Sequence, residues 1–124
     1  MPITDPARLV HRVVVDPIWV QDAEVSPQAF MPRPQDHGSL SASDKGCSAA
    51  EAHAAWLQRF PRSRANRCLT VTVADLHAAG LTVLDDSAEG DLHVGVEANP
   101  GVHWPLAAEH LARVCQIWAP QPNR

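Results

Sequence analysis

The chain has 124 residues, of which 45% are hydrophobic and 19% are charged, and its net charge is −4. This length suits one core, so we expect a single domain over 1–124 with flexible ends at 1–7 and 120–124. The acidic balance argues against non-specific binding to nucleic acid, and no apolar run reaches the roughly 18 residues of a membrane span, which argues against a membrane partner.

The three cysteines, Cys47, Cys68 and Cys115, are odd in number and widely spaced. No CxxC or HxxxH pair accompanies them, so the sequence predicts reduced thiols, with neither a metal nor a cofactor. The first residues carry neither the cationic flank nor the apolar stretch of a secretory signal. The expected location is therefore the cytoplasm.

The valine-rich run 9–15 is the first predicted strand, and Asp16-Pro17 ends it. Residues 18–38 mix apolar side chains with turn formers and several prolines. This mixture predicts a long, ordered loop, followed by one short strand at 39–42.

Ser48 and Glu51 have the spacing of a capping box, in which each side chain binds the other residue's backbone amide. Apolar residues then recur at helical spacing as far as Phe60, and Pro61 follows. This pattern predicts a helix that ends before the proline.

The second half of the chain alternates short strands with helices. Strands are predicted at 68–73, 81–84 and 92–97. Between the first two, one or two helical turns at 74–79 end at Gly80, which can adopt the positive φ of a helix stop. A last helix begins at Pro105, with an apolar stripe through Ala107, Leu111, Val114, Cys115 and Trp118.

These elements predict an α+β domain. We expect a small, mainly antiparallel sheet of four or five short strands, with two main amphipathic helices packed on it. If the helix before residue 60 is a crossover connection, one strand pair is parallel and the sheet is mixed.

His11 and Arg12 are neighbours in the first predicted strand, so their side chains point to opposite faces of the sheet. Arg12 is either an ordinary charge on the solvated face of an edge strand or an anion clamp carried by that strand. The pattern alone does not choose between these two interpretations.

The segment 26–41 is the most unusual stretch, because a loop of this length in a small domain is often functional. Two prolines hold Arg33 in a defined direction, while Asp36 and His37 are a potential acid/base pair. Ser39 and Ser41 are potential anion-binding groups, and Phe30 is an apolar anchor. The alternative interpretation is a simple turn followed by an exposed edge strand.

His93 and Glu97 lie four residues apart on a predicted strand, so they share a face, and Gly95 leaves that face open. They are either a general acid/base pair or two residues on a solvated sheet face.

Charge is unevenly distributed along the chain. One turn is rich in arginine, at Arg59, Arg62, Arg64 and Arg67, and another is acidic, at Asp85, Asp86, Glu89 and Asp91. Such patches either steer a complementary partner or neutralise each other within the fold.

The run 16–41 resembles a group of small bacterial proteins. They share a proline followed by an aromatic residue and Val-Gln-Asp, then Ser-x-x-Ala-Phe, a proline-rich link, an Asp and Leu-Ser. They also share the later Val-Thr-Val strand and a histidine near residue 93. The resemblance implies that 16–41 is a fixed feature and adds no chemistry.

A second resemblance is to ADP-ribosyltransferase-like domains, in which a first-strand Arg or His precedes a serine-bearing strand and a later carboxylate. Arg12 or His11, Ser41 and Glu97 match those places. The chain departs from the pattern because it has no Ser-Thr-Ser motif, no tyrosine and few glycines.

Two hypotheses follow. The first is a protein–protein interaction module of the bacterial cytoplasm, a component of a defence or toxin–antitoxin operon, that binds a protein partner. Its expected binding residues are Phe30, Arg33, Asp36, His37, Ser39, Ser41, Arg62 and Arg64. The second is a small enzyme acting on a nucleotide or other anionic small molecule, with Arg12, His93 and Glu97 as candidate catalytic residues.

Overall fold

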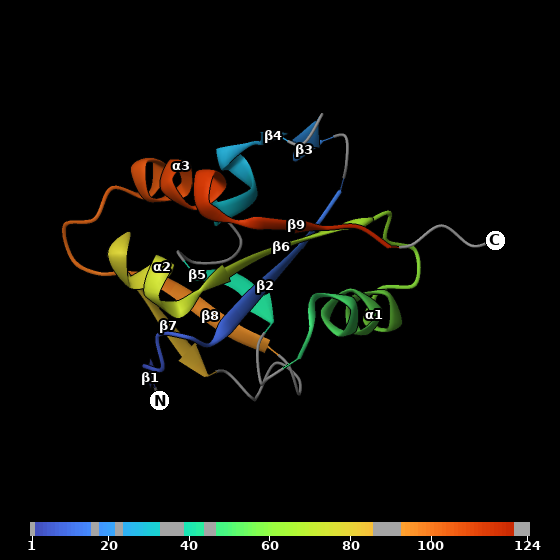
Figure 1. Ribbon diagram of the computed structural model, residues 1–124, viewed down its shortest axis with the longest axis horizontal. Helices are drawn as coiled ribbons and strands as arrows, with labels where there is room; N and C mark the ends of the chain where they lie inside the picture. Colours follow the sequence, from blue (N-terminus) through green and yellow to red (C-terminus); the bar gives the residue numbers. More distant parts are fainter. Residues whose placement is uncertain are drawn as a thin grey trace.

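The computed structural model describes residues 2–15, 18–21, 24–32, 39–43, 47–85 and 93–120, with the backbone alone at 39–43 and 93. In chain order the elements are β1 (Pro2–Ile3), β2 (Leu9–Val14), β3 (Val20–Gln21), β4 (Glu24–Val25), the 3-10 helix η1 (Pro27–Phe30), β5 (Ser39–Ser43), α1 (Ala49–Arg59), β6 (Arg67–Thr72), α2 (Val73–Ala78), β7 (Leu81–Asp85), β8 (His93–Ala98), α3 (Trp104–Val114) and β9 (Gln116–Trp118). The chain is therefore an α+β protein, as expected (Figure 1).

The described residues form a seven-stranded sheet in the order β1-β7-β8-β5-β2-β6-β9, and β3 pairs with β4 in a separate hairpin. Every one of these strand pairs is antiparallel, so the alternative of a mixed sheet is wrong. The sheet consists of two halves, because β2 and β5 are paired only at His11 and Ser43.

The expected number of four or five strands is also wrong, because β1 and β9 are too short to show a period in the sequence. Pro2 and Ile3, which we expected in a flexible end, pair with Leu84 and Val83 of β7. Within the region that we expected to be a loop, the described residues form the β3–β4 hairpin and η1. Of the expected flexible end at 120–124, residues 121–124 lie outside the described residues.

The helices begin where the sequence indicates. Capping boxes start α1 and α2, and Gly80 has the positive φ, 83°, expected of a helix stop. The prediction that the last helix continues to Trp118 is wrong, since it ends at Val114 and the chain then pairs with β6. No helix of the described segments is long and apolar enough to cross a membrane.

The sheet has a different cover on each face (Figure 1). The main core lies on one face, where α2, α3 and η1 pack against residues such as Val10, Leu69 and Val96. A second, smaller cluster lies under α1 on the other face and is built on Cys47, Ala52 and Cys68. Helix α1 packs mainly on β2 and β6, and its last residues, 58–59, are exposed.

The capping box of α1 gives the stability of this helix a dependence on pH. The amide of Ser48 donates to Glu51 Oε1 over 3.0 Å, and this bond, followed by that of the Ser48 hydroxyl, holds the pKa of Glu51 below its ordinary 4.5. Folding thus favours the ionised carboxylate. Its contribution is present above pH 4.5 and is lost as the pH falls further.

We expect Ser48→Ala to lower the free energy of unfolding by about 1 kcal/mol, because the amide of Glu51 loses its acceptor. Urea denaturation measures this change. Ser48→Asp is the matched control, since it keeps an acceptor at the cap. Equal stability of the alanine variant and the wild type contradicts the prediction.

Candidate functional site

The C-terminal end of α1 and the turn that follows it form the most distinctive surface of the described chain. The amide of Phe60 donates to the carbonyl of Trp56 over 2.8 Å and closes the helix. The amide of Ser63 then donates to the carbonyl of Phe60 over 3.0 Å, which closes a four-residue turn. Pro61 is the second residue of this turn, and its fixed φ favours the bend.

Side chains bind this turn to the helix. Trp56 Nε1 donates to Ser63 Oγ over 2.9 Å, and the amide of Ala65 donates to the same oxygen over 3.1 Å. One turn earlier in the helix, His53 Nε2 lies 2.8 Å from the carbonyl of Ala65. A carbonyl only accepts, so Nε2 carries the proton and donates. The turn is therefore held in one place before any ligand arrives.

An exposed aromatic side chain lies at the centre of this surface. Phe60 is 41% exposed and contacts Trp56 with ring centroids 4.6 Å apart at an angle of 46°. The guanidinium carbon of Arg59 lies 5.3 Å from the centre of the Phe60 ring, within the range of a cation–π interaction. An open hollow of about 630 Å³ is lined by Trp56, Arg59, Phe60, Pro61, Arg62 and Ser63. We call these residues, together with Arg64, the Arg–aromatic corner.

The corner is electropositive. Arg59, Arg62 and Arg64 are all exposed. Neither Arg62 nor Arg64 forms an ion pair or hydrogen bond with the described part of the chain. Arg67, the fourth arginine of the segment, is half-buried at the start of β6, where Nη1 donates to the Asn66 carbonyl over 2.7 Å. Three of the four arginines therefore face solvent around one aromatic side chain.

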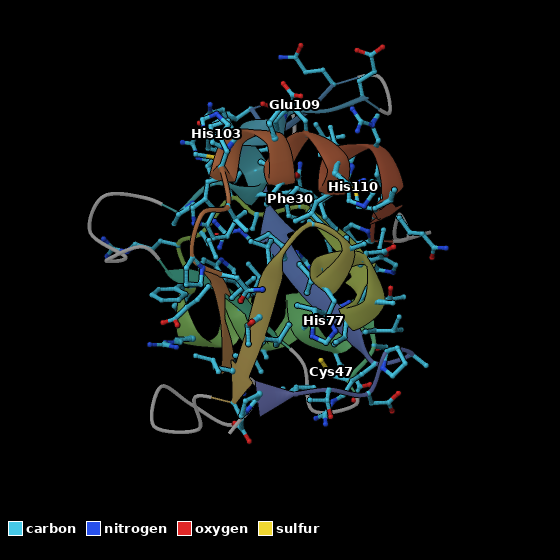
Figure 2. All side chains as sticks on the ribbon, turned by 90° about the vertical axis from the view of Figure 1, so that its left-hand side faces the viewer. Phe30, Cys47, His77, His103, Glu109 and His110 are labelled. Atoms are coloured by element: carbon cyan, nitrogen blue, oxygen red, sulfur yellow. The ribbon has the colours of Figure 1, made fainter. Side chains whose placement is uncertain are left out.

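The structure places the other expected site residues elsewhere. Phe30 is 2% exposed and lies under α3 in the main core, so it is not on a binding surface (Figure 2). Arg33, Asp36 and His37 lie outside the described residues. Ser39 and Ser41 belong to β5, where their backbones pair with Glu97 and Gly95 of β8.

Arg12 is half-buried on β2, between β5 and β6, and so is not on an edge strand as one of our two interpretations required. Its Nε donates to the carbonyl of Ala29 over 3.1 Å, on the face of the main core. Glu97 is exposed on the other face, because the alternate positions Val94 and Val96 are buried in that core. The structure therefore does not bring Arg12 and Glu97 together.

His93 begins β8, and its backbone pairs with Ser43. It lies four residues from Glu97 on one strand, so the two residues share a face of the sheet. The side chain of His93 lies outside the described part, and so a pairing with Glu97 stays a prediction.

His11 has a structural role. It is 1% exposed, with Nε2 2.8 Å from the Cys47 carbonyl and Nδ1 2.8 Å from Thr70 Oγ1. Since the carbonyl only accepts, Nε2 donates to it, and Nδ1 is hydrogen-bonded to the Thr70 hydroxyl. Both ring nitrogens therefore have partners inside the protein, so His11 presents no group to a substrate.

No family model, curated protein or solved structure matches this chain. In the described segments, no group of three or more His, Cys, Asp or Glu side chains is placed to hold a metal ion. The three cysteines are free thiols.

The sequence indicated part of the Arg–aromatic corner and missed the rest. Arg62 and Arg64 were expected to bind a partner, and they lie at or beside the hollow. Trp56 and Phe60 were assigned to the apolar stripe of a helix. The signal that distinguishes them is the interleaving of aromatic and arginine residues directly before and after Pro61.

Burial disfavours the thiolate form of Cys68 and Cys115. It raises the pKa of Cys68 to about 12, with a smaller contribution from Cys47, and the pKa of Cys115 to about 11. We expect iodoacetamide at neutral pH to modify Cys115 slowly and Cys68 only after unfolding in urea, as measured by peptide mass spectrometry. Equal labelling of Cys68 in native and unfolded protein contradicts the prediction.

We expect Ser63→Ala to lower the free energy of unfolding by about 1 kcal/mol, because Trp56 Nε1 and the Ala65 amide both lose their acceptor. Thermal and urea unfolding measure the loss. Ser63→Thr keeps the hydroxyl and serves as the control. If the alanine variant is as stable as the threonine variant, the turn is not held by these bonds.

Proposed function

We propose that this chain is a protein–protein interaction module that binds its partner through the Arg–aromatic corner. The observation that carries the proposal is the exposure of Phe60, which is held on Trp56 among exposed arginines. Tryptophan, arginine and other large aromatic residues supply much of the binding energy at the centres of protein interfaces. In the free protein the exposed part of the Phe60 ring contacts water. A partner that covers this part removes apolar surface from water, which contributes favourably to the free energy of binding.

The rigidity of the corner also supports a binding role. The turn is held by the Phe60–Ser63 backbone bond and by the bond from Trp56 to Ser63. A surface that is already ordered loses less conformational entropy when a partner docks. The affinity available from a few contacts is correspondingly higher.

Binding fits the corner better than catalysis. Among the described residues, the hollow is lined by no carboxylate and no imidazole, the groups that most often transfer protons in enzymes. Of the three candidate catalytic residues Arg12, His93 and Glu97, Arg12 lies on the opposite face of the sheet from Glu97. We also propose that the chain acts in the bacterial cytoplasm, as a component of a defence or toxin–antitoxin operon. Identification of the partner tests this part of the proposal.

We expect Phe60→Ala to weaken partner binding by about tenfold or more, as for a central aromatic residue of an interface. The full chain is purified with a tag from cells of its source organism, and the proteins that accompany it are quantified by mass spectrometry. A protein captured by the wild type is then purified, and its dissociation constant is measured with each variant.

Leu106→Ala is the matched control, because Leu106 is an apolar side chain that is 63% exposed on α3, away from the corner. Its partner affinity is expected to equal that of the wild type. Capture and affinity that Phe60→Ala leaves unchanged overturn the proposed function.

A further inference from the structure

We infer that the segment received by the Arg–aromatic corner is acidic, a short stretch of Asp and Glu around one bulky apolar side chain of a partner protein. This inference rests on the proposed function and names the chemistry of its partner. It follows from the charge of the corner, from the type of its basic residues and from the apolar wall of its hollow.

The charge of the corner is opposite to that of the whole chain. The net charge is −4, yet Arg59, Arg62 and Arg64 gather three positive charges at the end of one helix. Within the described residues, Arg62 and Arg64 have no carboxylate partner. Like charges at close range repel, and an incoming carboxylate converts this repulsion into attraction. The local field therefore selects an anionic segment.

The basic residues of the corner are arginines, and nine of the ten basic residues in the chain are arginine. A guanidinium presents a planar set of donors that matches the two oxygens of a carboxylate. This geometry also matches a phosphate. A nucleic acid is the less favourable occupant, because a long phosphate chain needs a continuous basic surface and the rest of this chain is acidic.

The apolar part of the hollow specifies the rest of the segment. Phe60, Pro61 and the half-buried Trp56 form one wall, next to the arginines. A leucine or phenylalanine side chain placed there covers the exposed part of Phe60, while flanking carboxylates reach Arg62 and Arg64. Exposed ion pairs alone contribute little to affinity. The residues that contribute most to binding lie in the part of an interface from which water is excluded, and the apolar contact with Phe60 supplies that part.

The test measures binding of labelled peptides to the full chain by fluorescence anisotropy. The probe is Asp-Glu-Asp-Phe-Asp-Glu-Asp. One control replaces every Asp and Glu by Asn and Gln, and the other replaces Phe by Ala. We expect the probe to bind, the amide control to bind about tenfold more weakly or not at all, and the alanine control to be intermediate. No binding of the probe at about millimolar concentration overturns the inference.

Variants locate the peptide on the surface. The double variant Arg62→Glu, Arg64→Glu is expected to lose about tenfold or more in affinity. Arg113→Glu, the same change at an exposed arginine of α3, is expected to lose almost none. Higher salt weakens binding to the wild type, because exposed ion pairs are screened. Equal losses in both charge variants overturn the inference, and circular dichroism of each variant excludes a loss caused by unfolding.

The same variants separate this inference from the proposed function. If the captured partner depends on Phe60 but is indifferent to salt and to the arginine changes, the interaction module stands and the acidic segment does not. If an oligothymidylate binds more tightly than the peptide and depends on the same arginines, the partner is a nucleic acid. If the chain alone self-associates in sedimentation, and the double variant does not, the acidic sequence 85–91 of a second copy is the occupant. Either of these last two results overturns the inference.

Discussion

The hydrogen bond from His11 Nε2 to the Cys47 carbonyl ties the start of α1 to the sheet, and this helix carries Trp56 and Arg59 of the corner. His11 lies in the middle of the sheet, while Cys47 directly precedes the cap at Ser48. Within the N-terminal half of the helix, His53 donates to the Ala65 carbonyl, in the segment that leads to β6. Two buried imidazoles thus hold the N-terminal half of α1 on a cluster that contains few large side chains. Directed hydrogen bonds here replace some of the packing that a larger core supplies.

Most elements of the fold were predictable because their patterns are local. The strands β2, β6, β7 and β8, and the starts of α1 and α2, follow from β-branched runs and capping boxes. The end of α3 was not predictable, since Cys115 and Trp118 continue the apolar helical stripe of the sequence. In the structure, Trp118 packs 5.2 Å from the His53 ring and pairs with Cys68 on β6. This pairing joins residues about fifty positions apart, and tertiary contact of that kind overrides local helix preference.

The sequence predicted the basic residues of the candidate site, but it did not predict the exposed aromatic side chain beside them. A run of arginines signals a surface, so Arg62 and Arg64 were identified. Trp56 and Phe60 share the helical spacing of core residues, and spacing does not show that Phe60 is 41% exposed at the end of the helix. The opposite error occurred at Phe30, because a proline-rich context suggested a surface and the residue is instead buried under α3. Alternation placed His11 and Arg12 on opposite faces but could not show that both faces of this central strand are covered.

The corner is attached to the fold without being required for it. The main core lies on the other face of the sheet, and α1 is fixed through His53 and its cap, whereas Phe60 and the three arginines contribute little burial. A protein that needed only to fold would gain stability by separating those charges and by burying or replacing the exposed ring. Their grouping on a turn held by Ser63 is the feature that the proposed interaction module explains.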